Sequence, residues 1–285
     1  MFTVTIDWLS VTFKVITNEA KNFIRKYSSA MPITDEAPRL GYNAASRDAN
    51  GVLCMWHTNR EEMGNHYIFS GSALRNICSG DIHRALEITR DASNAGGHIT
   101  RLDLAKDAYD EHVAVESVAK RMANGDFTGT SKTYSHVKSS DGGETLYIGS
   151  RQSERFIRMY LKGVEMGYAD KDWVRLEIEL KGMQARSAAW VIADKNCTLD
   201  ELFSTILNEI VKIPKCGDWT KFIKSGAKVG LPKLERMTDR EKWIEKQVTP
   251  AVTEHYQENP NSEAVSRLKA ALLFIEAQRA RDDEQ

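Results

Sequence analysis

Hydrophobic and polar residues alternate in three separate segments of the chain. In 173–181, apolar residues hold the even positions and charged residues hold the odd positions from 175 onward; segments 98–108 and 155–162 repeat this pattern. Successive side chains of a strand point to opposite faces, so each segment predicts a strand with one apolar face and one polar face. The residues predicted on the polar faces are Arg101, Asp103, Asp107, Arg158, Tyr160, Lys162, Arg175, Glu177 and Glu179.

The rest of the pattern predicts short strands interrupted by helices. Further strands are expected at 2–15, 39–46, 51–58 and 65–70, and a hairpin at 131–138 and 144–150 around the turn Ser140-Asp-Gly-Gly143. Helices are expected at 18–29, with Asn18 as the cap, and at 72–92, 113–124, 183–195, 198–211 and 262–281. This order predicts an α+β fold of antiparallel sheets with helices packed on one face. The uncovered, polar sheet face would then form the active site.

The chain is expected to divide at residue 211. Residues 1–211 would form the α+β domain, in two sheet halves at 1–110 and 111–211, and 212–285 would form a basic, helical C-terminal region. Residues 212–233 hold six lysines and one acidic residue. Cations interleaved with aromatics suit a groove that tracks a nucleic-acid strand, although a solvated linker has the same composition. The candidate DNA-binding residues of this segment are Lys215, Trp219, Lys221, Lys224 and Lys228.

The composition narrows the possible functions. A net charge of −1 gives no global basic field, so any attraction to nucleic acid must come from local patches. The four cysteines are scattered and form no CxxC pair, which predicts reduced thiols in a cytoplasmic protein. The sequence shows no signal peptide, no run of membrane-spanning length and no P-loop.

Carboxylates on neighbouring strands favour a divalent-metal site. Mg²⁺ and Mn²⁺ prefer oxygen ligands, and Asp103 and Glu177 each lie centrally in a predicted strand. Asp107 and Glu179 share the polar face and are further candidate ligands. The alternative is that these carboxylates only form exposed ion pairs with nearby arginines, which are common and weakly stabilising.

Tyr160 is the candidate nucleophile on the same face. A tyrosine can form a covalent intermediate, but its phenol is a poor nucleophile near neutral pH unless its surroundings activate it. Arg158, Lys162 and Arg175 would offset the charge of a phosphodiester and stabilise its transition state. A purely structural tyrosine on a sheet is the alternative.

Several segments, taken in order, resemble one known family. They are Ile6-Asp-Trp-Leu-Ser-Val-Thr-Phe13, Thr100-Arg-Leu-Asp-Leu-Ala-Lys-Asp107, Thr145-Leu-Tyr-Ile-Gly-Ser-Arg-Gln-Ser153, Arg158-Met-Tyr-Leu-Lys162 and Arg175-Leu-Glu-Ile-Glu-Leu-Lys181. Together they resemble the replication initiation factor family, which includes rolling-circle plasmid initiators and filamentous-phage replication proteins. The resemblance spans roughly residues 3 to 250.

The resemblance implies a metal-dependent enzyme that nicks and rejoins single-stranded or cruciform origin DNA. Tyr160 would become joined to the 5′ phosphate, and Mg²⁺ or Mn²⁺ would be held by Asp103 and Glu177. Tyr147 lies on the same predicted face and is the alternative nucleophile. Asp7 and Asp107 are alternative metal ligands that could replace or join Asp103. Arg101 and Arg151 are further candidate DNA contacts.

The resemblance also bears on partners and on rival functions. The chain has no evident helicase region, so a host helicase is an expected partner, and a homodimer would supply two nucleophiles. A non-catalytic, sequence-specific DNA-binding regulator on the same fold is the rival function. A protein-interaction domain with a charged sheet face is a third.

Overall fold

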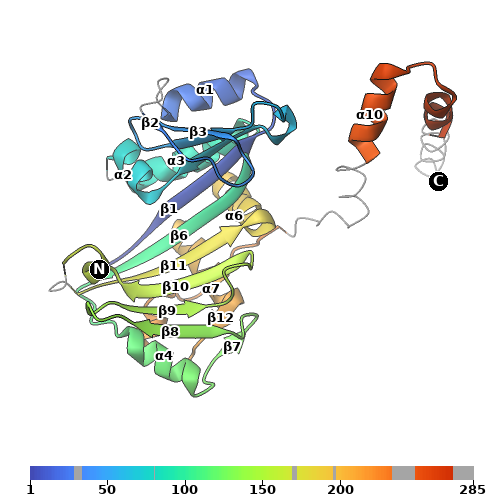
Figure 1. Cartoon of the computed structure of the whole chain (residues 1–285). Helices are drawn as coiled ribbons and strands as arrows, with labels where there is room; N and C mark the ends of the chain where they lie inside the picture. Colours follow the sequence, from blue (N-terminus) through green and yellow to red (C-terminus); the bar gives the residue numbers. More distant parts are fainter. Residues whose placement is uncertain (29–33, 80, 169–171, 195–196, 233–247, 272–285) are drawn as a thin grey trace. The chain divides into compact units, whose positions relative to one another are not determined.

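The larger of the two compact units of the chain is built around an antiparallel sheet (Figure 1). The computed structural model describes residues 1–28, 34–79, 81–168, 172–194, 197–232 and 248–271. Within them, ten strands follow the order β2-β3-β4-β5-β1-β6-β11-β10-β9-β8. Their bounds are β1 Phe2–Phe13, β2 Thr34–Asp35, β3 Ala44–Arg47, β4 Leu53–Trp56, β5 Asn65–Phe69, β6 His98–Tyr109, β8 Tyr134–Lys138, β9 Glu144–Ile148, β10 Arg155–Leu161 and β11 Trp173–Lys181. A separate pair joins β7 (Thr128–Gly129) to β12 (Val211–Lys212).

The register of the central strands brings the predicted polar residues together. Strand β11 pairs with β6 on one side and with β10 on the other, so the two predicted sheet halves form one continuous sheet. Glu179 lies opposite Asp103, and Glu177 lies opposite Arg158. Strand-opposite residues point to the same face, so the three polar faces of the sequence form one surface.

A β-bulge adds residues from β1 to this surface. Ile6 lies opposite Leu104 and Trp8 lies opposite Asp103, so Asp7 is an extra residue with no partner of its own in that pairing. A bulge re-aims side chains locally. Asp7 and Trp8 consequently both line the polar side, although strict alternation would have placed them on opposite faces.

Helices pack against the apolar face of the sheet. Helices α3, α6 and α7 contact the central strands, and α4 contacts β9 and β10 (Figure 1). The helices are α1 Asn18–Tyr27, α2 Gly71–Cys78, α3 Ile82–Asn94, α4 Val115–Ala123, α5 Lys162–Glu165, α6 Gly182–Asp194, α7 Leu199–Ile210, α8 Gly217–Thr220 and α10 Thr249–Glu258, with a 3₁₀ turn at Glu61–Met63. This confirms the predicted α+β fold with antiparallel strands and helices on one face.

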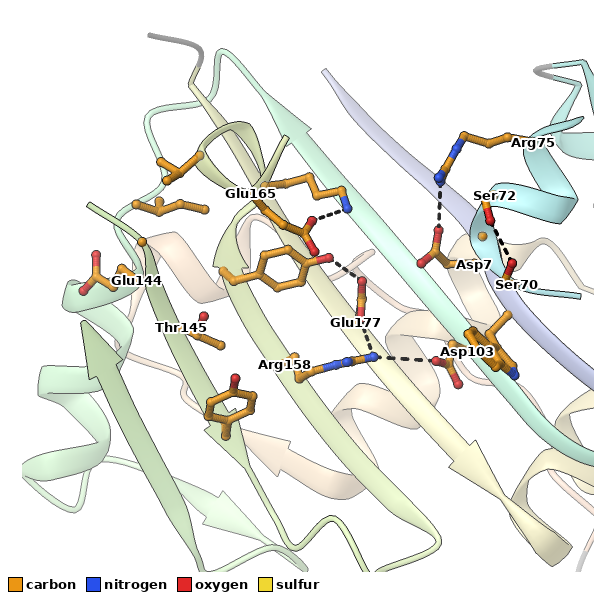
Figure 2. A pocket seen from close by; sticks show the side chains of 18 of the residues that line it. Asp7, Ser70, Ser72, Arg75, Asp103, Glu144, Thr145, Arg158, Glu165 and Glu177 are labelled. Carbon is orange, nitrogen blue, oxygen red and sulfur yellow. Dashed lines mark hydrogen bonds and ion pairs between the residues drawn. The ribbon is translucent and has the colours of Figure 1, made fainter. Parts of the chain in front are cut away.

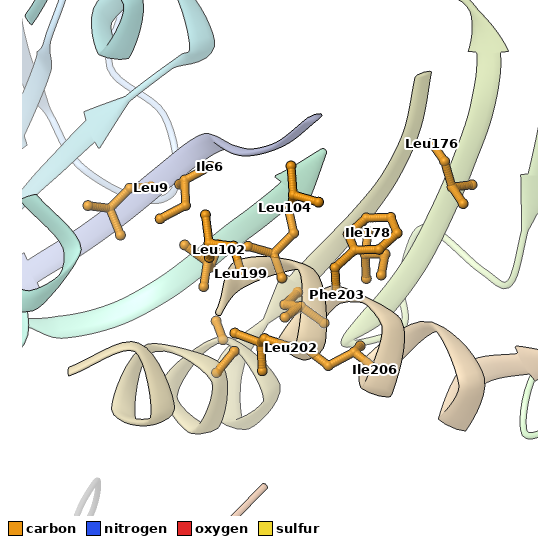
Figure 3. Packing of buried hydrophobic residues seen from close by; sticks show 14 of the residues in the cluster. Ile6, Leu9, Leu102, Leu104, Leu176, Ile178, Leu199, Leu202, Phe203 and Ile206 are labelled. Atoms are coloured by element: carbon orange, nitrogen blue, oxygen red, sulfur yellow. The ribbon is translucent and has the colours of Figure 1, made fainter. Parts of the chain in front are cut away.

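The core lies between the helices and the three long strands β1, β6 and β11 (Figure 3). Leu102 and Leu104 of β6 and Ile178 of β11 meet Leu202 and Phe203 of α7, and all five side chains are fully buried. Each such side chain contributes about 1.5–3 kcal/mol to folding through burial. The core therefore fixes the strands whose opposite faces carry the polar residues.

The structure corrects two predictions about where helices begin and end. The predicted helix 72–92 is two helices, because Ser79 ends α2 in a left-handed conformation (φ 50°) and Asp81 begins α3 as its cap. The cap of α1 is Thr17, whose side chain accepts a hydrogen bond from the Ala20 amide, and not Asn18. Among the described helices, none has both the length and the apolarity of a membrane span.

The basic segment after residue 211 packs beside the helices, on the apolar side of the sheet. Trp219 and Phe222 are fully buried in the main core, and Lys106, from the apolar side of β6, donates a 2.9 Å hydrogen bond to the Phe222 carbonyl. The prediction that Trp219 stacks on nucleic-acid bases is therefore wrong. The compact unit that contains the sheet continues past the predicted boundary at residue 211. It includes the basic segment up to residue 232.

The second compact unit contains the described residues 248–271. It holds α10 and a following helical stretch that begins at residue 263. The helix predicted at 262–281 is described only as far as residue 271, and its remainder lies outside the described residues. Val265 in this stretch is buried.

The burial of Trp219 predicts a large loss of stability on truncation. Trp219→Ala is expected to lower the free energy of unfolding by about 3–5 kcal/mol, because it removes a large, fully buried side chain. Trp190, on α6, is the matched control: its side chain is 54% exposed, so Trp190→Ala should change stability by about 0.5 kcal/mol or less. Urea denaturation measures both. Equal small losses would contradict the placement of the basic segment.

Candidate active site

The polar face of the sheet carries an open cavity of about 690 Å³ (Figure 2). Strands β1, β6, β9, β10 and β11 form its floor, and the beginning of α2 and helix α5 form part of its wall. The residues lining it include Asp7, Trp8, Arg75, Arg101, Asp103, Tyr147, Arg158, Tyr160, Lys162 and Glu177. The site residues predicted on the three strands therefore gather largely at this one cavity.

Tyr160 makes a short hydrogen bond to a carboxylate at the floor of this cavity. Its hydroxyl donates to Oε1 of Glu177 at 2.6 Å, from β10 to the neighbouring strand β11. Partial burial and the adjacent Glu177 carboxylate raise the pKa of Tyr160 far above the ordinary value for tyrosine. The phenol is consequently neutral at physiological pH, and a proton acceptor is already in hydrogen-bonding position.

Two arginines neutralise the central carboxylates. Nη2 of Arg158 lies 2.7 Å from Glu177 and 3.7 Å from Asp103 (Figure 2). Arg101 binds both oxygens of Asp103, at 2.6 and 2.9 Å, and lies 2.8 Å from Glu179. Burial nevertheless raises the pKa of Asp103 to about 6, because the loss of solvent outweighs the attraction of Arg101. The carboxylates are thus buried participants in a network and not exposed surface pairs.

Arg175 forms a second, more deeply buried ion pair next to this network. It binds both oxygens of Asp107 at 2.7 Å each, and its Nη1 lies 3.0 Å from Asp7. The Trp173 indole also donates to Asp107 at 2.7 Å. With only 7% of its side chain exposed and three hydrogen bonds to Asp7 and Asp107, Arg175 holds these two carboxylates in place and offers little to a substrate. Its predicted direct role in phosphate binding does not match this geometry.

The arrangement is an ion-pair network and not a ready-made divalent-metal site. Among the described residues, no group of three or more His, Cys, Asp or Glu side chains is placed to hold a metal ion. The oxygen donors of Asp103 and Glu177 are the chemistry that Mg²⁺ prefers, but an Arg158 nitrogen already lies between them. The other two candidate ligands are also paired with cations. Asp107 forms an ion pair with Arg175, and Glu179 lies 2.6 Å from Lys181 and 2.8 Å from Arg101.

Two further cations, Lys162 and Arg75, line the cavity and add positive charge to it. The Lys162 ammonium lies 5.6 Å from the centre of the Tyr160 ring and is paired with Glu165. Arg75 extends from α2 to within 3.8 Å of Asp7, and 61% of its side chain is exposed (Figure 2). Sequence analysis missed Arg75, because it lies on a helix and the strand pattern carries no signal for it. Gly71 is adjacent, and a Cβ there would lie 2.8 Å from the Asp7 carboxylate, so only glycine lets α2 approach this closely.

Tyr147 lines the same cavity in a different environment. Its ring stacks on Phe156 with centroids 5.8 Å apart, and the Arg151 guanidinium lies 5.2 Å from the Tyr147 ring centre. In the described part of the chain, its hydroxyl has no hydrogen-bond partner that could accept its proton. The geometry therefore distinguishes the two candidate tyrosines and favours Tyr160.

The predicted lysines of the basic segment are not part of this cavity. Lys221 donates to the Glu111 carbonyl at 2.8 Å, and Lys224 pairs with Glu201 of α7 at 2.9 Å. Lys215, Lys221, Lys224 and Lys228 are absent from the residues that line the polar-face cavity. The positive charge at this cavity comes from its arginines and Lys162.

The comparisons with known proteins agree with this fold. Residues 97–265, more than half of the chain, match the family model described as replication initiation factor. The chain belongs to the replication initiation factor family. The matched residues include β6, β10 and β11, the strands that supply Asp103, Tyr160 and Glu177.

Two individual proteins resemble this member of the replication initiation factor family. Over 142 residues the chain is 29% identical to a Bacillus subtilis (strain 168) protein provisionally named DNA relaxase NicK, covering 43% of this chain and 38% of that protein. The structure of the rolling circle replication initiator protein from Geobacillus stearothermophilus superposes with a TM-score of 0.65 at 21% identity. That match covers 85% of this chain and 91% of the other, and it establishes a shared fold.

Proposed function

We propose that the protein nicks and rejoins one strand of DNA at a replication origin through a covalent phosphotyrosine at Tyr160. The observation that carries this proposal is the 2.6 Å hydrogen bond from the Tyr160 hydroxyl to Glu177, at the floor of an open cavity lined by cations. A nucleophile hydrogen-bonded to a base is one of the arrangements that covalent catalysis uses. Family membership supports the same activity.

The proposed cutting step transfers a phosphoryl group from DNA to the enzyme. The Tyr160 oxygen attacks the phosphorus, its proton passes to Glu177, and the bond from phosphorus to the 3′ oxygen breaks. The departing 3′ oxygen takes a proton from water and leaves a free 3′ hydroxyl, while the 5′ phosphate stays on Tyr160. Rejoining is the reverse reaction, in which a 3′ hydroxyl attacks the phosphotyrosine.

The cations around Tyr160 would stabilise the charge that develops on the phosphate. Lys162 stands over the Tyr160 ring, and Arg75 offers an exposed guanidinium at the rim. Nε of Arg158 is buried and has no hydrogen-bond partner among the described residues, so this donor is unused in the free protein. Cations in a partly water-excluded site are stronger stabilisers of such charge than cations in bulk water.

The divalent ion stays a prediction of the sequence, and the mechanism above uses no step through it. If the predicted dependence on Mg²⁺ or Mn²⁺ holds, EDTA is expected to reduce adduct formation to the background of a nucleophile-free variant. A gel assay with and without the chelator measures this. Adduct formation at an unchanged rate in EDTA would leave the arginine network as the source of positive charge.

The rival function is a DNA-binding regulator without cleavage. One assay distinguishes it from the proposed nicking activity. The full-length protein, incubated with single-stranded DNA from the origin of its own genetic element, is expected to give a slow-migrating protein–DNA adduct on a denaturing gel. Tight binding with no cut strand and no adduct, across the common divalent ions, would favour the regulator. A host helicase and a homodimer remain proposed partners of the nicking activity.

A further inference from the structure

A second cavity lies directly beside the proposed active site. It has a volume of about 390 Å³ and is lined from β1, β6, β11, α2 and the beginning of α3. Asp7, Gly71, Arg75 and Lys162 line both this cavity and the active-site cavity. A DNA strand bound at Tyr160 would therefore have a side opening into this space, past two cations.

A pair of stacked aromatic rings forms one wall of the second cavity. Tyr109, at the end of β6, and Trp173, at the start of β11, lie opposite each other in the sheet, with ring centroids 4.9 Å apart and an angle of 29° between the ring planes. The Trp173 indole is fixed by its 2.7 Å hydrogen bond to Asp107. The stack is thus held in place before any ligand binds, and Tyr109 remains 37% exposed.

The remaining lining suits a flat, partly polar group. Leu74 and Ala85 supply apolar surface from α2 and α3. Thr3, Thr5 and Asp81 supply hydroxyl and carboxylate groups that can meet hydrogen-bonding edges. A nucleobase has an aromatic face for the ring stack and polar edges for these groups, and its backbone phosphate matches the two cations.

We propose that this cavity binds one unpaired base of the DNA strand, next to the phosphate held at Tyr160. The base continues the Tyr109–Trp173 stack, and Arg75 and Lys162 hold the phosphate that links it to the active site. This inference rests on the proposed function, because it assumes that the active-site cavity binds DNA. It assigns to Tyr109 and Trp173 a role in positioning and selecting the strand.

Photo-crosslinking identifies the residues that contact the base. The probe is a single-stranded oligonucleotide of about a dozen thymidines, a length within the usual range for such sites, with one thymidine replaced by 5-iodouridine. After irradiation with the full-length protein, peptide mass spectrometry is expected to find the crosslink on Tyr109 or Trp173. Crosslinks on Tyr147 or Phe156 instead would place the base at the other end of the cavity and overturn the proposal.

Binding measurements on matched variants give a second test of the proposed base site. Tyr109→Ala is expected to weaken binding of the oligonucleotide about tenfold, because one stacking contact is lost, whereas Tyr109→Phe keeps the ring and should bind like wild type. The control is Tyr134→Ala: Tyr134 is equally exposed at 37%, but it lies on the edge strand β8 outside both cavities. Wild-type affinity for Tyr109→Ala, or no binding by any protein, would overturn the proposal.

The two proposals fail in distinguishable ways. If the oligonucleotide binds and crosslinks to Tyr109 or Trp173 but origin DNA yields no adduct, the base site stands and the nicking activity fails. If the adduct forms while the crosslink and the Tyr109→Ala effect are both absent, the nicking activity stands and the base site is rejected.

Discussion

Tyr160→Phe is expected to abolish cleavage of origin DNA and formation of the covalent adduct. The substitution removes only the phenolic oxygen, so the rate should fall by on the order of 10⁶-fold, which in a gel assay is below detection. The ring and the strand remain, and the lost hydrogen bond to Glu177 should cost only about 1 kcal/mol of stability. Circular dichroism and urea denaturation of the same preparation check that the variant folds.

Tyr147→Phe is the matched control for this prediction. Tyr147 lines the same cavity on the neighbouring strand, and the ring contacts to Phe156 and Arg151 are kept in the variant. Its hydroxyl has no acceptor in the described part of the chain, so its removal should leave the cleavage rate within about twofold of wild type. The opposite result, with Tyr147→Phe inactive and Tyr160→Phe active, would move the nucleophile to Tyr147.

Glu177→Gln is expected to slow cleavage by about 10²–10⁴-fold. The amide keeps the size of the side chain but cannot take the proton from Tyr160, and general-base catalysis is worth roughly this factor. The variant also leaves Arg158 without its nearest carboxylate, at 2.7 Å, although Asp103 remains nearby. Single-turnover rates of adduct formation, measured with saturating DNA, report the chemical step directly.

Glu179→Gln is the control that separates two effects of Glu177→Gln, the loss of the general base and the loss of one negative charge. Glu179 lies two residues further along β11, on the same face, and pairs with Arg101 and Lys181 but not with Tyr160. Its substitution removes the same charge from the same network. We expect a loss of less than about tenfold. Equal losses for Glu177→Gln and Glu179→Gln would show that the network charge matters and that Glu177 is not the base.

Strand alternation is sufficient to predict the floor of the candidate active site. Asp103, Tyr160 and Glu177 were placed on a common face from sequence alone, because side-chain direction in a regular strand depends only on position. The structure confirms the fold and brings these residues to one cavity. The pairing of β6 with β11 then decides which of them touch.

The parts that sequence reasoning missed depend on departures from regular strands and on tertiary packing. Asp7 is an alternative metal ligand in the sequence, but its place at the cavity depends on a bulge, which alternation cannot anticipate. Arg75 comes from a helix far from the catalytic strands in the sequence. The lysines around Trp219 favour a DNA contact, but its side chain is fully buried in the core, which local composition does not reveal.

The predicted metal ligands illustrate a further limit. Spacing showed that the carboxylates of Asp103 and Glu177 share a face, but it could not show which cation balances them. In the structure an Arg158 nitrogen lies between them. Arginine and a divalent ion both satisfy a carboxylate pair, so the choice depends on side-chain geometry that the sequence pattern does not encode.

The most direct test of the central claim is to identify the residue that carries DNA. The wild-type protein is trapped with single-stranded origin DNA, digested with nuclease and protease, and the peptides are sequenced by mass spectrometry. The account predicts a nucleotide joined through its 5′ phosphate to Tyr160, in the peptide of strand β10. A nucleotide on Tyr147, or on any serine or threonine, would contradict it.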